Sequence, residues 1–123
     1  MSYLRPLADI YADLKKEPDP RQLSTKDTGK FKATYMHHAV IRDGLDHYAP
    51  GWEWLTNIQG IEGKIYVTGT LIINGSDGRV SRDGIGNEDD DVAGYGDPSS
   101  NADAQALRRA AMAHGFCRSL WKK

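Results

Sequence analysis

The chain has 123 residues, of which 39% are hydrophobic and 27% charged, and this suits one globular domain over residues 1–123 with no room for a second core. It lacks both the roughly 18–20 consecutive apolar residues of a membrane span and the charged-then-apolar start of a signal peptide. Its single cysteine, Cys117, excludes a disulfide framework and a zinc site built from cysteines. We therefore expect a protein of the reducing cytoplasm with no membrane association.

The charges are segregated along the chain, although they sum to −1. Residues 1–42 hold eight basic and five acidic residues, residues 43–103 hold three and twelve, and residues 104–123 hold five and none. The three segments therefore carry +3, −9 and +5. Because a summed charge near zero says little about the local field, it does not exclude a nucleic-acid partner.

The first half of the chain predicts two helices separated by a loop. Residues 4–16 place their apolar side chains in one stripe at helical spacing, and the prolines within 17–20 end that helix. Residues 21–32 are polar and basic, and we predict a loop there. A second helix is predicted over 34–48, where apolar residues recur at i, i+4 and i+7.

The middle of the chain predicts three strands joined by short turns. Residues 52–58 alternate for part of their length, residues 64–73 are rich in β-branched side chains, and residues 79–86 form a weaker third run. Gly-rich turns at 60–63 and 74–78 separate these runs. Short turns favour antiparallel pairing, so the sequence predicts a three-stranded meander.

The last third predicts an acidic loop and then a long helix. Residues 87–101 show no apolar period, and we expect a mobile loop. Residues 101–121 are alanine-rich and apolar nearly all round, which favours burial against the sheet and against a neighbouring subunit. The predicted fold class is therefore α+β, with the order α-α-β-β-β-α and the meander packed against helices.

Arg108 and Arg109 are the main candidates for a binding role, because they are adjacent on a helix that is otherwise apolar. A guanidinium pairs with phosphate oxygens through two hydrogen bonds and keeps its charge when it is partly buried. The alternative is that both arginines merely reach solvent from a central core helix.

The helix that carries these arginines resembles a known signature. Residues 106–121 contain Ala-Leu-Arg-Arg-Ala-Ala, then Gly-Phe, then Arg-Ser-Leu-Trp. This resembles the signature helix of single-strand annealing proteins of the Rad fifty-two and DdrA type, which carry Ala-Leu-Lys-Arg-Ala-Ala, Phe-Gly and Arg-Tyr-Leu-Tyr. Residues 4–21, 35–52 and 82–86 resemble further segments of these proteins in the same order. Ala113-His114 and Ser119 stand where that family usually has aromatic residues.

The resemblance implies a protein that binds single-stranded DNA in a basic groove of a homo-oligomeric ring or filament and anneals complementary strands without ATP, in homologous recombination and repair. It implies that Arg108 and Arg109 contact the DNA backbone, and that Lys26, with Lys30 and Lys32 in the same predicted loop, lines the groove. It also implies a minimal phage or bacterial form in the cytoplasm of a bacterium or of a phage-infected host cell. A host or phage single-strand-binding protein is a candidate partner.

We expect no enzymatic activity and no cofactor, since the sequence lacks a phosphate-binding Gly-x-x-x-x-Gly-Lys-Ser/Thr loop. Two alternatives stay open. One is a small metal-dependent nuclease that uses the acidic cluster Glu88, Asp89 and Asp91, although consecutive acids more often belong to a solvated loop. The other is an assembly module with no role on DNA. The histidines lack zinc spacing, so no metal site is predicted.

Overall fold

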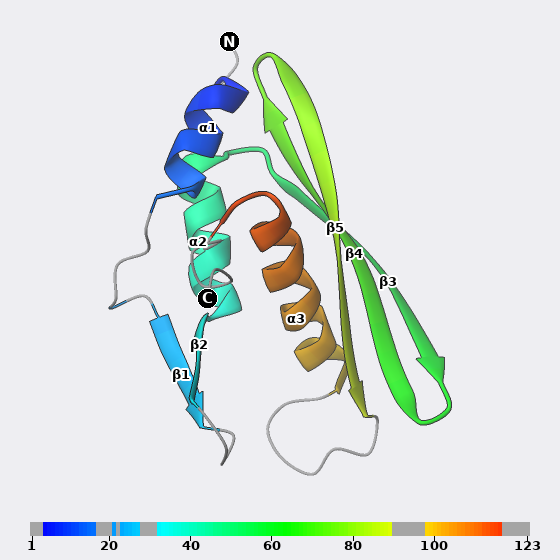
Figure 1. Cartoon of the computed structure of the whole chain (residues 1–123). Coiled ribbons are helices and arrows are strands. Elements are labelled where there is room, and N and C mark those ends of the chain that lie inside the picture. The colour runs from blue at the N-terminus through cyan, green and yellow to red at the C-terminus, as the bar shows by residue number, and fades with distance from the viewer. Residues whose placement is uncertain (1–3, 17–20, 22, 28–31, 90–97, 117–123) are drawn as a thin grey trace.

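The computed structural model describes residues 4–16, 21, 23–27, 32–89 and 98–116. Its elements run helix, two strands, helix, three strands, helix (Figure 1). In chain order they are α1 (Leu7–Leu14), β1 (Leu23–Asp27), β2 (Lys32–Met36), α2 (His38–Tyr48), β3 (Glu53–Ile61), β4 (Lys64–Gly75), β5 (Gly78–Asp89) and α3 (Pro98–Ala113). The predicted α+β class, with an antiparallel sheet packed against helices, is confirmed.

The main sheet is the predicted three-stranded antiparallel meander, with β4 in the centre. Glu62 and Gly63 join β3 to β4, and both have positive φ, as in a two-residue hairpin turn of type I′. Pairing continues up to this turn, where Ile61 lies opposite Lys64. Because the ladders extend as far as the turns, all three strands are longer than the sequence pattern predicts.

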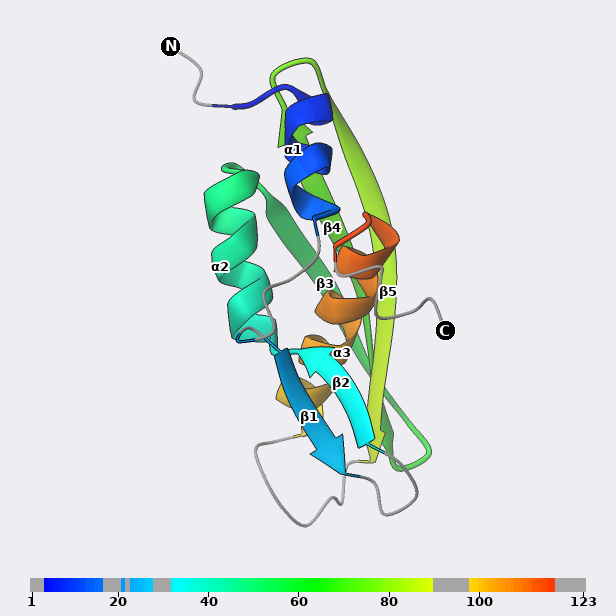
Figure 2. The same ribbon diagram turned by 60° about the vertical axis from the view of Figure 1, so that its left-hand side comes forward.

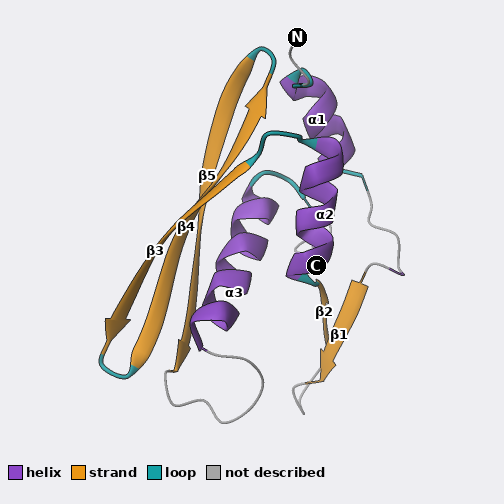
Figure 3. Cartoon of the chain, turned by 180° about the vertical axis from the view of Figure 1, so that it is seen from behind, coloured by secondary structure: helices purple, strands orange, loops and turns teal. Residues whose placement is uncertain are grey.

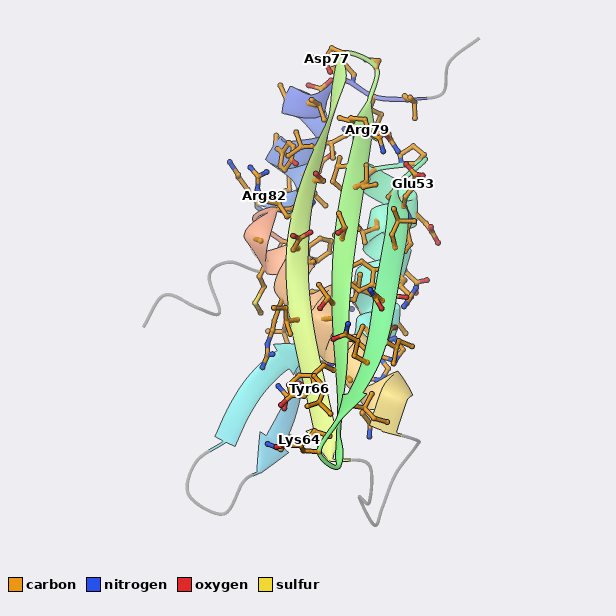
Figure 4. All side chains as sticks on the ribbon, turned by 90° about the vertical axis from the view of Figure 1, so that its right-hand side faces the viewer. Glu53, Lys64, Tyr66, Asp77, Arg79 and Arg82 are labelled. Carbon is orange, nitrogen blue, oxygen red and sulfur yellow. The ribbon has the colours of Figure 1, made fainter. Side chains whose placement is uncertain are left out.

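All three helices lie on one face of this sheet (Figures 1 and 3). α3 packs directly on β5 and β4, while α1 and α2 complete the helical layer. Figure 4 faces the opposite side of the sheet, which the helices leave uncovered. The core is the space between the two layers, and residues from each helix and from β4 fill it. Its fully buried large members are Ile10, Leu45, Leu71, Ile73, Leu107 and Val67.

α3 approaches β5 closely because both surfaces are made of small residues. Gly84 and Gly86 face the helix, and a Cβ atom at either position would overlap the backbone of Ala106 or Ala102. Ala102, Ala106 and Ala110 are themselves fully buried. The alanines of α3 therefore form a seam along which the helix backbone rests on the strand.

The prediction of a loop over 21–32 is wrong, because this segment contributes to a second antiparallel sheet, the β1–β2 hairpin (Figure 2). Its pairing runs from Leu23 opposite Met36 to Asp27 opposite Lys32. Met36 is buried and Leu23 packs against the same core. The strands are polar and short, so they lack the apolar alternation by which the other strands were recognised.

The second helix begins at His38, not at residue 34. The His37 Nδ1 atom accepts a hydrogen bond from the Ala39 backbone N–H at 3.1 Å and so caps the helix. Thr34 and Tyr35 favour strands, and they belong to β2. The prediction of a helix over 34–48 is therefore correct only from His38 onward.

The last helix begins earlier and ends earlier than the predicted 101–121. Gly115 has a φ of 109°, and the Phe116 and Gly115 N–H groups donate to the Ala111 and Met112 carbonyl oxygens at 3.0 and 2.9 Å. This is a Schellman cap, which ends the helix at Ala113. The segment beyond residue 116 lies outside the described residues.

The prediction of a loop over the whole of 87–101 is wrong at both ends. β5 continues to Asp89, and α3 begins at Pro98. The intervening residues 90–97 lie outside the described part of the chain.

Candidate nucleic-acid interface

Arg108 and Arg109 lie in the second half of α3, between Ala106 and Ala110 of the seam on β5. Arg108 is half-buried and Arg109 is exposed. Because the backbone of α3 is held against the sheet on one side, both guanidinium groups extend from a rigid support. The position of the pair on a central helix agrees with the sequence analysis, whereas their contact with a nucleic acid stays a prediction.

The Arg109 guanidinium is already engaged within the chain. Its Nη1 atom donates a hydrogen bond to the carbonyl oxygen of Ile85 on β5. One turn earlier on α3, the Gln105 side chain bonds to both backbone groups of Asn87, with 2.9 Å from Nε2 to the carbonyl oxygen and 3.4 Å from the amide nitrogen to Oε1. α3 is thus joined to β5 by side chains as well as by its seam.

Asp103 of α3 joins three elements, and sequence reasoning did not assign it a role at the site. Its Oδ2 atom accepts from Arg42 Nη2 of α2 at 3.2 Å, and its Oδ1 atom accepts from Trp54 Nε1 of β3 at 2.9 Å. The Trp54 ring lies on Gly69 of β4. Trp54 is therefore a core anchor.

His38 extends the basic surroundings of Arg108 onto α2. Burial is the main cause that lowers its pKa, followed by the charges of His37, Arg42 and Arg108, while Asp103 acts in the opposite direction. The His37 and His38 rings lie 4.4 Å apart. Arg108 and Arg42 thus share one end of the helical layer with two histidines that sequence reasoning treated only as unpromising zinc ligands.

His114 is the one buried polar or charged residue among those that the structure describes, with 3% of its surface exposed. Its Nε2–H donates to the Leu71 carbonyl oxygen at 2.8 Å, so Nδ1 is the acceptor for the Tyr11 hydroxyl at 2.7 Å. Burial lowers the pKa of His114, and the charge of Arg82 lowers it further against the effect of the Leu71 bond. His114, one of the residues that depart from the family pattern, therefore links α1, β4 and the end of α3.

The basic residues of the predicted loop lie on the β1–β2 hairpin. Lys26 belongs to β1 and pairs across to Ala33, and Lys32 belongs to β2. The hairpin and the main sheet lie on opposite sides of α3 (Figures 1 and 3). The side chains of Lys26 and Lys32, and all of Lys30, lie outside what the structure describes. Their place beside the arginines of α3 therefore stays a prediction.

The acidic cluster is not placed by the structure. Glu88 and Asp89 end β5, but their side chains and the whole of Asp91 lie outside the described part. Within the described residues, no group of three His, Cys, Asp or Glu side chains could hold a metal ion. Cys117, the single cysteine, also lies beyond the described range.

The fold and this arginine-bearing helix define an α+β protein in which a meander and a C-terminal helix carry the candidate site, as the resemblance to the annealing proteins implied. No family model matches the chain. It is 26% identical, over 117 residues, to the DNA repair RAD52-like protein 1, mitochondrial, of Arabidopsis thaliana. The match covers 91% of this chain, which spans 65% of the length of that relative. This distant similarity confirms the resemblance that the sequence analysis stated.

No helix among the described residues is long and apolar enough to cross a membrane.

Proposed function

We propose that this protein binds single-stranded DNA through its phosphate backbone and anneals complementary strands without ATP, as a homo-oligomer, in homologous recombination and repair. The observation that carries the proposal is the similarity to a RAD52-like DNA repair protein along 91% of the chain. At this coverage the similarity extends over most of the described fold.

The fixed position of α3 and the chemistry of the guanidinium group support the proposed roles of Arg108 and Arg109. The helix is fixed to β5 along its alanine seam, so the backbone positions from which both arginine side chains extend are fixed. Guanidinium groups that neutralise phosphates supply affinity that does not depend on base sequence. A DNA strand that is bound through its phosphates keeps its base edges available to a complementary DNA strand.

Lys26, Lys30 and Lys32 are proposed to contribute further phosphate contacts from the β1–β2 hairpin. This hairpin precedes α2 directly, and the α2 end that it meets carries His38, near the charges of Arg42 and Arg108. A DNA strand bound by α3 would thus meet basic residues from α3, from α2 and from the β1–β2 hairpin.

Annealing needs no nucleotide hydrolysis in this proposal, because base stacking in the product duplex supplies about 1.4 kcal/mol per base-pair step. The protein only has to bring two strands together in an orientation that permits pairing. Such a role places the chain among binding proteins and not among enzymes.

The test is the annealing of complementary labelled oligonucleotides, followed by fluorescence transfer with no ATP present. We expect annealing faster than the spontaneous reaction, and a rate that saturates as protein coats the strands. A wild-type rate equal to the spontaneous one would contradict the proposal. Incubation of the same DNA with Mg²⁺ should leave it intact, and cleavage would instead favour the nuclease alternative.

A further inference from the structure

Two basic side chains beside the last turn of α3, Lys15 and Arg82, have no acidic partner among the described residues. None of the ion pairs in the described part of the chain includes either of them. Both residues are exposed. Arg82 bonds to the carbonyl oxygen of its neighbour Ser81 at 2.9 Å, which leaves most of its guanidinium N–H groups for another acceptor. Two cations without a counter-charge therefore lie at one end of the helical layer.

Lys15 lies across the end of α3, where α1 and α3 meet beside β5 (Figure 2). A Cβ atom at Gly115 would lie 3.1 Å from Lys15 Cγ and 3.3 Å from Lys15 Cε, so the aliphatic stem of the lysine crosses this glycine. The Lys15 Nζ atom lies 6.0 Å from the centroid of the Tyr11 ring. The Tyr11 hydroxyl is itself held by His114 Nδ1 at 2.7 Å. The ammonium group is therefore placed by its packed stem above a ring that is fixed in position.

Arg82 approaches the same two rings from β5. It lies opposite Leu71, whose side chain is fully buried under the helices, and side chains of opposite residues share one face of a sheet. The Leu71 carbonyl oxygen accepts the bond from His114 Nε2 at 2.8 Å. Burial raises the pKa of Tyr11 and lowers that of His114, and the charge of Arg82 lowers both. Lys15 and Arg82 thus reach the Tyr11–His114 pair from two different elements.

The acidic residues that neighbour these cations in the sequence are engaged elsewhere. Asp13, two residues before Lys15, already accepts two ion pairs at 2.7 and 2.9 Å. Asp83, next to Arg82, accepts a hydrogen bond from the Thr70 hydroxyl at 2.7 Å. Because alternate residues of a strand face opposite sides, Asp83 and Thr70 lie on the uncovered face of the sheet. No described carboxylate acts on the pKa of the tyrosine or of the histidine between the two cations.

We propose that Lys15 and Arg82 together bind a phosphate group beside the end of α3. A phosphate has several acceptor oxygens, so it can accept from an ammonium group on α1 and from a guanidinium group on β5 at the same time. The site contains neither arginine of α3. The phosphate can come from the free ion or from the backbone of a nucleic acid, and only the second case rests on the proposed function.

The first experiment is an NMR titration of the isotope-labelled full chain with inorganic phosphate at constant ionic strength and about pH 7, where the ion carries about −1.5 to −2. The amide signals of Gly115 and Arg82 should shift and saturate in the millimolar range. Acetate at the same concentrations should shift them much less, because a carboxylate has a smaller charge and fewer acceptor oxygens. A titration in which neither amide responds to phosphate, or in which acetate acts equally, overturns the proposal.

Two variants remove one cation each. Lys15→Met retains an apolar stem across Gly115 and removes the charge, and Arg82→Gln removes the guanidinium group from an exposed position. Each should weaken phosphate binding about tenfold, the effect of one lost charged hydrogen bond. Lys64→Met is the matched control, because Lys64 is an exposed lysine at the far end of the sheet (Figure 4). Unchanged binding by both variants, or equal weakening by the control, contradicts the site.

The same variants identify the source of the phosphate. If it belongs to a nucleic-acid backbone, each variant should weaken the binding of a fluorescent oligothymidylate and reduce the slope of log affinity against log salt by about 0.7. If both quantities stay unchanged while inorganic phosphate binds, the source is the free ion. A chain that binds phosphate here but anneals no DNA retains this site and contradicts the proposed function. A chain that anneals DNA while its Gly115 and Arg82 amides ignore phosphate retains the proposed function and overturns this site.

Discussion

His114 joins three elements through its two ring nitrogens, and this makes the stability of the fold sensitive to acid. Its neutral form satisfies the Leu71 carbonyl oxygen and the Tyr11 hydroxyl at the same time. Because burial lowers its pKa below 6.5, the unfolded chain binds a proton more readily than the folded chain does. The pKa of His38 is lowered as well, so both residues act in the same direction.

The free energy of unfolding should therefore be constant above pH 6.5, the ordinary pKa of histidine, and should decrease as the pH falls below it. The measurement is urea denaturation at a series of pH values between about 5 and 8. His114→Gln, whose amide can still donate to Leu71, should reduce the slope below pH 6.5. The same slope for His114→Gln as for the wild type would show that His114 is not its source. His47→Gln, on the exposed end of α2, is the control and should retain the wild-type slope.

Arg108→Ala tests the other residue that the sequence singled out. Loss of a charged hydrogen-bond donor to phosphate should weaken the binding of single-stranded DNA about tenfold. Fluorescence anisotropy with a labelled oligonucleotide measures the change. Arg79→Ala is the matched control, because Arg79 lies exposed near Glu53 at the far end of the sheet (Figure 4). Equal affinities for Arg108→Ala and the wild type would remove Arg108 from the interface.

At the scale of elements, the packing of α3 on β5 depends on the absence of side chains. Gly84 and Gly86 admit the backbone of the helix itself, and the facing helix residues are alanines. No rearrangement of a flexible side chain can make room there, because the atoms in contact are backbone atoms. The seam is therefore rigid, and the backbone of α3 at Arg108 and Arg109 is held in a fixed position.

Gly84→Ala should lower the free energy of unfolding by about 2–3 kcal/mol, because a Cβ atom would force α3 away from the sheet. Gly60→Ala is the control within the same sheet, since a Cβ there would lie 3.9 Å from the Lys64 carbonyl oxygen, an ordinary contact. The control should change stability by less than about 0.5 kcal/mol. Thermal or urea unfolding compares the two variants, and similar stabilities for both would contradict the rigid seam.

Elements could be predicted from the sequence where their own composition indicates whether they are buried and which secondary structure they form. β4 is β-branched and α3 is alanine-rich, so both were identified, and Arg108 stood out as a charge on an apolar helix. The β1–β2 hairpin was missed because its strands are polar, and only Met36 and Leu23 connect it to the core. The roles of Asp103 and His114 depend on partners 49 and 43 residues away, which no local pattern contains.

At the scale of the whole molecule, the distribution of charge matters more than its sum of −1. One basic residue from each end of the sequence acts on the same group in the helical layer, since Arg42 and Arg108 both lower the pKa of His38. The acidic middle contributes the sheet, whose strand β3 has no basic residue. The segregation along the sequence does not become a segregation between the two layers, because the helices α1, α2 and α3 sum to −2 and the strands β3, β4 and β5 to −1.

Binding led by phosphates should be sensitive to salt. If each protomer neutralises two phosphates, the affinity for single-stranded DNA should fall about sevenfold between roughly 50 and 200 mM NaCl. Anisotropy titrations at several salt concentrations give the slope of log affinity against log salt. An affinity that salt does not alter would mean that base contacts, not the backbone, hold the strand.

The seam between α3 and β5 also constrains how this protein can change over evolution. A side chain added on the strand would meet backbone atoms of the helix, so no smaller residue on the helix can compensate for it. A larger side chain on the helix cannot be compensated on the strand either, because glycine is already the smallest residue. Substitutions should therefore be tolerated on the uncovered face of the sheet but not at these positions. Homologues should show the glycines of β5 and the alanines of α3 retained together, and sequence divergence should concentrate on the side of the sheet that the helices leave free.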